Sequence, residues 1–329
     1  MAVLITGGSG FVGSHVVIEL VEEEKEDKIV IYDVAPPTIR SIIDHLGKEV
    51  IYVDGNILDF GRLLETIKKY DVQGIIHTSF LGNFKSINAN PLNCVTTNFN
   101  GTMNILELAR INNLKVVYTS SGAIYGEVEE YATENLPIKP GDMYGMIKAV
   151  CELLGEQYAR TYNIDYVAAR LYFIYGQNRL YNPRSLNELF DPPITPTDVL
   201  TMFVQKSVKG EVLHFTKGGD LKLDFTYVKD AAHGVLLAYY TKKPLHMAYN
   251  ISSGKTHSLK EIANIINEYS GKNCVNIGPG IVEGWPPRPK YLDNTLAKKE
   301  LGYSPKYTID KGLIELYQTV KDDISANKL

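Results

Sequence analysis

The sequence predicts an α/β fold in which a doubly wound parallel sheet is followed by a smaller, mixed α/β C-terminal lobe. Short runs of apolar and β-branched residues alternate with longer segments of helical periodicity through the first half of the chain. A glycine-rich turn follows the first of these runs directly, and the composition changes after Gly176. With 329 residues, the chain is long enough for two lobes or for one large elaborated fold.

The expected strands are near-continuous apolar runs, as is typical of strands that are covered on both faces of a parallel sheet. They span residues 2–6, 28–33, 50–53, 74–78 and 115–120, with a sixth strand at 166–174. Helical patterns separate them at residues 10–24, 59–70, 92–112 and 142–163. Because crossovers between parallel strands are right-handed, we expect the ligand site at the carboxyl edge of this sheet.

The chain beyond residue 176 is expected to form mainly a substrate-binding lobe, residues 177–329. Prolines are frequent in segments 177–197 and 279–289, which we interpret as loops. Helical periodicity resumes at residues 198–208, 228–240, 259–269 and 309–322. We assign residues 1–176 to the first lobe and expect residues 225–254 to return to it.

Composition argues against several classes of protein. The chain has 34 basic and 38 acidic residues, which leaves no strongly basic face for a nucleic-acid partner. No segment approaches the ~18 apolar residues of a membrane span, and no basic region precedes the first apolar run, so we expect a cytoplasmic protein. The three cysteines, Cys94, Cys151 and Cys274, are too widely spaced for a disulfide framework or a thiolate metal site. We therefore expect three buried free thiols and no metal ion.

The turn at residues 6–13 reads TGGSGFVG and lies between the first strand and the first helix. Gly7 permits a tight turn, Gly10 lets a pyrophosphate approach the N–H groups of the helix N-terminus, and Gly13 permits close packing of helix on strand. Asp33 lies about twenty residues further on, where its carboxylate would accept hydrogen bonds from a ribose and repel a 2′-phosphate. The pattern predicts a Rossmann-type site for NAD rather than NADP.

Tyr144 and Lys148 form a Tyr-x-x-x-Lys pair on one face of the helix expected at 142–163. An ammonium beside a phenol stabilises the phenolate and lowers the tyrosine pKa, which provides a base for a hydroxyl proton. In a chain with 22 tyrosines this spacing also arises by chance. It recurs at three places that we expect to be surface pairs: Tyr239/Lys243, Tyr307/Lys311 and Tyr317/Lys321. Position favours Tyr144, because its helix follows the strand that ends at Ser121.

A series of longer motifs appears in a fixed order. They are TGGSGFVG (6–13), Asp33, DGNILD (54–59), IIHTS (75–79), NFNGTMNILELAR (98–110), YTSSGAIYG (118–126), YGMIK (144–148), RLYFIYG (170–176) and DFTYVKDAAHG (224–234). From residue 2 to about residue 320, the chain resembles the extended short-chain dehydrogenase/reductase superfamily, in its NAD-dependent epimerase/dehydratase family. The resemblance implies an enzyme that binds NAD and a small-molecule substrate. It also implies a homodimer that pairs through helices 92–112 and 142–163.

The resemblance implies roles for individual residues. Tyr144 would be the acid/base, Lys148 would orient the nicotinamide ribose, and Ser121 would hydrogen-bond the reacting oxygen. The cofactor site would include Gly7, Gly10, Phe11, Val12, Gly13, Asp33, Asn56 and Ile57 beside the adenine, Ser79 and Asn98. Within this set, Asn98 would brace the active-site strands.

Several positions depart from the family pattern. After Ser121, Gly122 and Ala123 stand where dehydratases and decarboxylases of this family carry acids, so we do not expect elimination of water. Phe173 and Leu223 stand where sugar-nucleotide epimerases carry an asparagine and an arginine that contact the substrate diphosphate. A buried diphosphate needs charged partners, and loop arginines could replace those contacts. The candidates are Arg179, Arg184 and Arg288.

Three functions follow from these residues. The first is an NAD-dependent epimerase that oxidises a secondary hydroxyl of a sugar or nucleotide-sugar and reduces the ketone on its other face. The second is an NAD-dependent dehydrogenase of a free sugar, a sugar acid or another secondary alcohol without a nucleotide diphosphate. The third, a non-catalytic dinucleotide sensor, is disfavoured because Ser121, Tyr144 and Lys148 are present together.

Overall fold

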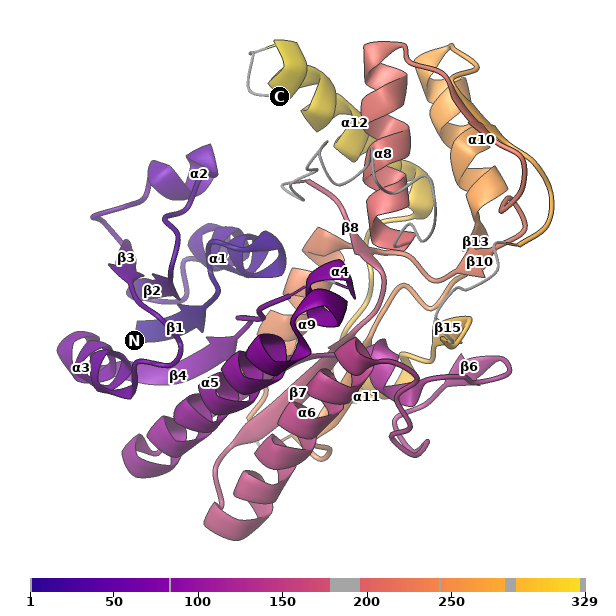
Figure 1. The fold of residues 1–329 in the computed structure, drawn as a ribbon. Helices are drawn as coiled ribbons and strands as arrows, with labels where there is room; N and C mark the ends of the chain where they lie inside the picture. Colours follow the sequence, from indigo (N-terminus) through magenta and orange to yellow (C-terminus); the bar gives the residue numbers. More distant parts are fainter. Residues whose placement is uncertain (1, 83, 178–195, 243, 282–287, 326–329) are drawn as a thin grey trace.

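The computed structural model describes residues 2–82, 84–177, 196–242, 244–281 and 288–325 (Figure 1). Its centre is a seven-stranded sheet, parallel throughout, in the order β12-β7-β5-β4-β1-β2-β3. The strands are β1 (Ala2–Thr6), β2 (Lys28–Asp33), β3 (Val50–Asp54), β4 (Val72–His77), β5 (Lys115–Ser121), β7 (Tyr166–Leu171) and β12 (Ala248–Ile251). The strand order runs outward in both directions from β1 and β4, which confirms the predicted doubly wound fold.

Helices cover both faces of the sheet, and two hydrophobic cores result. On one face lie α1 (Phe11–Glu23), α2 (Arg40–Ile43), α9 (Val228–Tyr240) and α11 (Thr295–Leu301). On the other face lie α3 (Phe60–Tyr70), α4 (Phe84–Ala89), α5 (Pro91–Asn112) and α6 (Met143–Tyr162). Alternate residues of β1 serve the two cores, Val3 and Ile5 one and Leu4 the other, which explains why the strand is apolar throughout.

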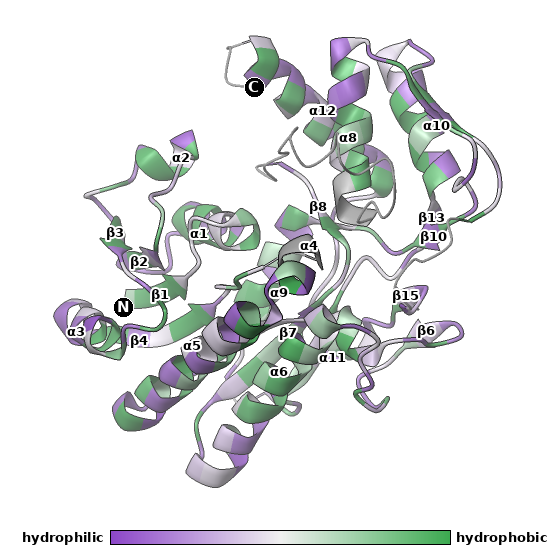
Figure 2. Ribbon diagram, viewed as in Figure 1, coloured by the Kyte–Doolittle hydropathy of each residue, from purple (hydrophilic) through white to green (hydrophobic). Residues whose placement is uncertain are grey.

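The second lobe has a third hydrophobic core and lies beyond the carboxyl edge of the sheet (Figure 1). It contains α8 (Pro196–Lys209), β9 (Leu213–Phe215), β10 (Lys222–Leu223), β13 (His257–Ser258), α10 (Leu259–Ser270), β14 (Val275–Ile277) and α12 (Ile309–Ser325). The ribbon of α10 alternates between hydrophobic and hydrophilic residues (Figure 2), as an amphipathic helix does. The two short sheets of this lobe, β14-β9 and β10-β13, make it a mixed α/β lobe.

Residues 228–251 run back to the first lobe. The helix α9 packs on α1, and β12 pairs with β7 at the edge of the central sheet. A smaller pair of strands, β6 (Tyr131–Ala132) and β15 (Tyr291–Leu292), joins the segment after β5 to the chain that precedes α11. The chain therefore passes between the two lobes more than once, and each lobe is built from segments that are far apart in the sequence.

The sixth strand is shorter than predicted. The strand expected at residues 166–174 ends at Leu171, and the chain then forms β8 (Ile174–Tyr175), which pairs with β11 (Thr226–Tyr227) in another sheet. At the break Phe173 has a φ of +37°, a conformation that costs a side-chain-bearing residue roughly 1–3 kcal/mol. The apolar run continues through both strands, so periodicity does not reveal the break.

The cysteines are free and buried, as predicted. The expectation of surface Tyr/Lys pairs is wrong for Tyr317, which is 9% exposed and belongs to the core of the second lobe. That tyrosine lies on the face of α12 that turns toward this core. Lys243 lies outside the described residues. Within the described parts of the chain, no helix is both long and apolar enough to cross a membrane.

Candidate functional site

A cavity of about 910 Å³ lies at the carboxyl edge of the central sheet. Its walls come from the turn between β1 and α1, the ends of β2, β4 and β5, the start of α6 and the segment that joins β7 to β8. They include the predicted residues Gly7, Gly10, Phe11, Val12, Gly13, Asp33, Asn56, Ile57, Ser79, Asn98, Ser121, Tyr144, Lys148, Phe173 and Arg288. The structure thus brings these residues together, whereas Arg179 and Arg184 lie outside the described residues.

The glycine turn forms a cradle at one end of the cavity. Gly7 has a φ of +73°, which favours glycine. A Cβ on Gly13 would lie 2.2 Å from the carbonyl oxygen of Gly7 and 2.6 Å from Oγ1 of Thr78, so only glycine fits there. Gly10 is the N-cap of α1 and supplies no side-chain cap, which leaves the N–H groups of the first turn available to an anion. The cradle therefore has the shape and polarity that a pyrophosphate requires.

Asp33 ends β2 beside this cradle. Its carboxylate accepts a hydrogen bond from the backbone N–H of Ser9 at 3.0 Å and faces the cavity. In the loop that follows the neighbouring strand β3, the Asn56 side chain accepts from the N–H of Leu58 at 2.9 Å, and the carbonyl of Ile57 accepts from Asn104 on α5 at 3.0 Å. A carboxylate beside an apolar wall suits the ribose and the adenine of a dinucleotide, so the residues present fit NAD.

Lys148 lies deep in the other half of the cavity. Its side chain is buried, and Nζ donates a hydrogen bond to the carbonyl oxygen of Thr119 at 2.6 Å. Burial lowers the pKa of Lys148 to about 8, because desolvation disfavours the charged form. Tyr144, one helical turn earlier, is half-buried, and its ring lies 5.2 Å from the ring of Phe80 in an edge-to-face arrangement.

Ser121 ends β5 and is the N-cap of the short helix η1 (Gly122–Tyr125). Its Oγ accepts a hydrogen bond from the N–H of Ala123 at 3.2 Å, which leaves the hydroxyl proton available for a second partner. A Cβ on Gly145 would lie 2.6 Å from the carbonyl oxygen of Ala123. The start of α6 therefore packs directly on η1, and this contact places Tyr144 and Ser121 on the same part of the cavity wall.

Asp142 fixes the start of α6. One carboxylate oxygen accepts a hydrogen bond from the N–H of Gly145 at 2.7 Å, as an N-cap residue does. The other oxygen pairs with the guanidinium of Arg288, which comes from the chain after β14. The predicted substrate arginine is thus anchored to the first turn of the helix that carries Tyr144.

Asn98 holds the chain that follows β4. Its Nδ2 donates to the carbonyls of Leu81 and Cys94, both at 2.8 Å, and its Oδ1 accepts from the N–H of Leu81 at 2.8 Å. The contacts are made to the loop between β4 and α4 and to α5 itself. The asparagine therefore shapes the cavity wall at Leu81, next to Phe80.

The two departures at the expected diphosphate contacts lie in different surroundings. Phe173 lines the cavity, with its ring centroid 4.4 Å from that of Tyr172 and 6.0 Å from that of Phe225. Leu223 is buried in the core of the second lobe. One substitution thus makes the cavity wall more apolar, whereas the other contributes to packing.

Sequence analysis missed several residues of the cavity wall, among them His77. Burial lowers the pKa of His77 to about 3, so its ring is neutral, and it bonds Thr6 at 2.7 Å and Thr102 at 3.2 Å. The other missed polar or aromatic residues include Thr78, Phe80, Asn93, Thr97, Thr119, Ser120, Asp142 and Tyr172. Residues 77–80 lie at and just after the end of β4, and residues 119–120 lie near the end of β5, so their position at the carboxyl edge of the sheet could have indicated them. No local signal marks Asn93 or Thr97.

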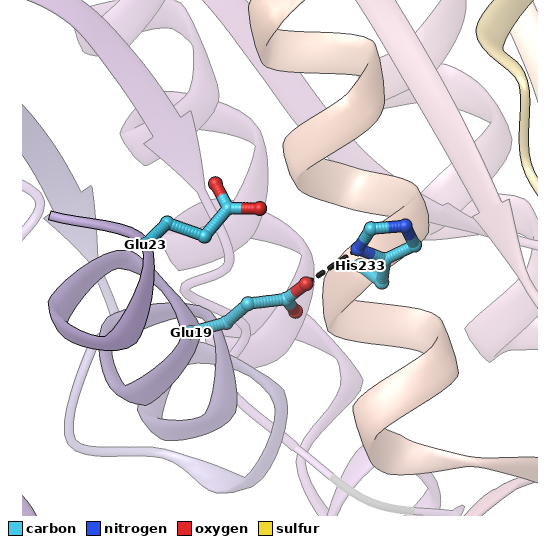
Figure 3. A group of neighbouring side chains, drawn as sticks. All are labelled: Glu19, Glu23 and His233. Atoms are coloured by element: carbon cyan, nitrogen blue, oxygen red, sulfur yellow. Dashed lines mark hydrogen bonds and ion pairs between the residues drawn. The ribbon is translucent and has the colours of Figure 1, made fainter. Parts of the chain in front are cut away.

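One group of potential metal ligands lies away from the cavity. Glu19 and Glu23 on α1 and His233 on α9 point toward one another, with ligand atoms within 4.8 Å (Figure 3). His233 Nδ1 lies 2.5 Å from Oε1 of Glu19, and Glu23 pairs with Lys25 at 2.9 Å. Each carboxylate in this group has a protein partner, and the contact between Glu19 and His233 joins α1 to α9.

Comparisons with known proteins agree with this geometry. The sequence profile of the NAD dependent epimerase/dehydratase family matches residues 3–252. A putative UDP-glucose 4-epimerase of Methanocaldococcus jannaschii is 31% identical, over 98% of this chain and 99% of that protein. UDP-glucuronic acid decarboxylase 5 of Arabidopsis thaliana is 30% identical, over 95% of this chain and 87% of that protein. The structure of UDP-glucose 4-epimerase from Thermus thermophilus, in complex with NAD, is 25% identical, with a TM-score of 0.80 over 98% of this chain and 99% of that chain.

The relatives include both epimerases and decarboxylases, so the likeness defines a family and a cofactor rather than one reaction. NAD is the cofactor that the family description and the solved relative share, and the glycine cradle with Asp33 fits it. The family profile covers most of the chain, and the relative at 31% identity covers nearly all of it. The chain therefore belongs to the NAD-dependent epimerase/dehydratase family and is an NAD-dependent enzyme.

Proposed function

We propose that the protein is an epimerase that oxidises a secondary hydroxyl of a sugar or nucleotide-sugar to a ketone and then reduces the ketone on its other face. The observation that carries this proposal is the shared cavity, in which Ser121, Tyr144 and Lys148 lie on the same walls as the glycine cradle. Its volume of about 910 Å³ is typical of sites for ligands of this size. The likeness to UDP-glucose 4-epimerases over nearly the whole chain supports the same reaction class.

The proton transfers are assigned to the chain's own residues. Tyr144 accepts the proton of the substrate hydroxyl and later returns a proton to the keto oxygen on the other face of the sugar. The ammonium of Lys148, which is charged at neutral pH because its pKa of about 8 lies above 7, stabilises the phenolate. Ser121 donates its hydroxyl proton to the reacting oxygen, since its Oγ already accepts the N–H of Ala123. Bound NAD supplies the acceptor and donor of the hydride.

The residues after Ser121 support an epimerase over a dehydratase. Gly122 and Ala123 carry no acid, and general acid/base assistance to elimination contributes about 10²–10⁴-fold. A Cβ on Gly122 would lie 2.5 Å from the ring of Tyr172 and 2.9 Å from Leu292, so the packing leaves no room for a carboxylate at that position.

An NAD-dependent dehydrogenase of an alcohol without a diphosphate is the second candidate. The apolar wall formed by Tyr172, Phe173 and Ile174 favours it, because a diphosphate requires charged or polar partners. Within the described cavity wall, the arginine available to an anion is Arg288, which pairs with Asp142.

A homodimer is also proposed. The outer face of α5 and α6, which pack against each other, carries exposed apolar side chains. They are Leu92, Val95, Met103 and Ile111 on α5 and Met143, Met146, Val150, Leu153 and Tyr162 on α6. Pairing of this face with its copy across a two-fold axis would cover these side chains in a four-helix contact.

The test is product analysis with purified, NAD-loaded protein. The panel contains UDP-, dTDP- and GDP-sugars, free sugars and uronic acids, with products identified by NMR and absorbance followed at 340 nm. An epimeric product without a lasting rise in absorbance at 340 nm supports the epimerase. Formation of NADH in proportion to an oxidised product identifies the dehydrogenase. A keto-deoxy sugar or released carbon dioxide would contradict both. Binding of NAD without turnover of any substrate would favour the sensor.

A further inference from the structure

Phe80 contacts both members of the Tyr144–Lys148 pair. It follows β4 on the cavity wall, and its ring meets that of Tyr144 edge to face, with 5.2 Å between centroids and 74° between planes. The Nζ of Lys148 lies 4.5 Å from the centroid of the same ring. A second ring, that of Tyr118 on β5, lies 5.1 Å from Nζ. The ammonium thus has one aromatic ring from the chain that follows β4 and one from the neighbouring strand β5.

The buried ammonium has little other compensation. Lys148 has three N–H donors, and its hydrogen bond to the carbonyl of Thr119 uses one of them. Among the described residues, no carboxylate lies within ion-pair distance of its Nζ. A buried charge without a partner is costly, and the electron-rich faces of aromatic rings attract a desolvated cation.

We propose that Phe80 and Tyr118 form an aromatic cage that positions the Lys148 ammonium and holds it in its charged form. Phe80 is a positioning residue, because it acts on the reaction through Lys148 and Tyr144. The cage rests on the geometry of the side chains alone. Its consequence for turnover rests on the proposed function, in which Lys148 stabilises the phenolate.

Four other titratable groups act on Lys148 from the elements packed around it. His77 on β4 is neutral because burial lowers its pKa to about 3, and burial raises the pKa of Tyr118 on β5 well above its usual value. On α6 itself, burial raises the pKa of the Cys151 thiol, and the carboxylate of Glu152 pairs with a buried arginine of β7. Burial keeps His77 neutral and raises the pKa values of Tyr118 and Cys151, whereas the pKa of Lys148, about 8, lies between pH 6 and pH 9, so the pH dependence of the cage follows the charge of the lysine.

The cage stabilises the fold only while Lys148 is charged. The native pKa of about 8 lies below the ordinary value of 10.5, so the unfolded chain binds more protons between these values. The contribution of this lysine to stability therefore rises with pH from about 8 to 10.5. Loss of the cage lowers the native pKa of Lys148 further. The resulting loss of stability is therefore fully present below about pH 7 and disappears at higher pH, as Lys148 becomes neutral.

The first experiment compares Phe80→Leu with Phe80→Tyr by thermal unfolding of the full chain from pH 6.5 to pH 9.5. Leucine keeps apolar volume but removes the ring, whereas tyrosine keeps the ring. Relative to wild type, we expect the Tm deficit of Phe80→Leu to be larger at pH 6.5 than at pH 9.5 by roughly 2 °C, and that of Phe80→Tyr to be independent of pH. A deficit of Phe80→Leu that is the same at both pH values would show that the ring only fills space.

The same comparison in two further variants tests whether the lysine causes the effect. When Phe80→Leu is added to Lys148→Met, the pH-dependent part of its Tm deficit should vanish. When Phe80→Leu is added to Tyr144→Phe, that part should persist, because the phenol is not its source. Persistence in the Lys148→Met background would overturn the cage.

Turnover separates the cage from the proposed function. With UDP-glucose as the substrate, the alkaline fall of kcat in Phe80→Leu should move about one pH unit lower than in wild type, and in Phe80→Tyr it should not move. If Phe80→Leu shows the pH-dependent Tm deficit but the protein turns over no substrate, the cage is supported and the proposed function is contradicted. If the protein turns over a substrate but the Tm deficit of Phe80→Leu is independent of pH, the proposed function is supported and the cage is contradicted.

Discussion

Tyr144 is distinguished from the other tyrosines by its surroundings rather than by its spacing from a lysine. The large side chains of Tyr32, Tyr118, Tyr125 and Tyr175 are fully buried, whereas Tyr144 is half-buried on the wall of the cavity. A phenol must reach both solvent-filled space and its lysine to exchange a proton with a ligand. Of the tyrosines on the described cavity wall, Tyr32 and Tyr172 are buried and Tyr144 is half-buried, so position and exposure together favour Tyr144 as the acid/base.

The first prediction concerns Tyr144→Phe. Removal of the phenol oxygen should lower kcat by about 10²–10⁴-fold, because it removes the group that transfers the proton. Thermal stability and NAD binding should change little, since the ring is kept. The measurements are initial rates on the substrate identified by product analysis and the NAD-dependent rise in Tm. Unchanged turnover would remove Tyr144 from the mechanism.

The second prediction concerns the glycine cradle. In Gly13→Ala the new Cβ meets the Gly7 carbonyl at 2.2 Å, so the turn must shift, at a cost of about 1–3 kcal/mol of stability. The shift should also abolish the rise in Tm that NAD produces. Gly61→Ala on α3 is the matched control, because its Cβ lies 3.6 Å from the nearest atom. If Gly13→Ala bound NAD as wild type does, the cradle would not be the pyrophosphate site.

At the scale of elements, the start of α6 joins the two lobes. Asp142 caps the helix at Gly145 and pairs with Arg288, so the same carboxylate fixes the helix that carries Tyr144 and the chain that returns from the second lobe. The break between β7 and β8 has a related effect, because it turns Phe173 into the cavity and sends the following strand into a different sheet.

The third prediction separates the two contacts of Asp142. In Asp142→Ala both are lost, and loss of the N-cap alone destabilises a protein by about 0.5–2 kcal/mol. Asp142→Asn keeps an N-cap acceptor and removes only the ion pair, so its free energy of unfolding should lie between those of wild type and Asp142→Ala. Chemical denaturation of the three proteins measures this order. Equal stabilities for Ala and Asn would show that the cap contributes nothing here.

At the scale of the whole molecule, the exposed apolar face of α5 and α6 predicts an assembly. Leu153→Glu places a charge in the middle of the proposed contact and should shift the protein from dimer to monomer, because an unpaired charge is costly to bury. Light scattering coupled to size exclusion measures the mass. Leu245→Glu, at a position that is 82% exposed outside this face, is the control and should leave the mass unchanged. A wild-type protein that is monomeric at micromolar concentration would contradict the proposed dimer.

Much of the architecture could be predicted from the sequence because its signals are local. The strand at residues 28–33 and the helix at 228–240 were predicted at the bounds that the structure shows. The glycine turn was recognisable because a strand, a tight turn and a helix N-terminus are adjacent in the chain. Tyr144 and Lys148 share a helix face because they are four residues apart. In each of these cases, the residues that make the feature are neighbours in the sequence.

Other features depend on contacts between distant segments, and only the tertiary structure decided them. Phe80 and Lys148 meet because the chain that follows β4, the strand next to β5, lies against the sheet face that α6 covers. Leu223 belongs to a core whereas Phe173 faces the cavity, although both are apolar replacements at expected ligand contacts. The sequence by itself determined the order of elements, the cofactor turn and the candidate acid/base, since hydrophobic periodicity and short spacings specify local geometry. The wall of the cavity was decided by packing between segments that are distant in the sequence, because such packing sets which side chains share a surface. Among the described residues these segments belong to the first lobe, apart from Arg288.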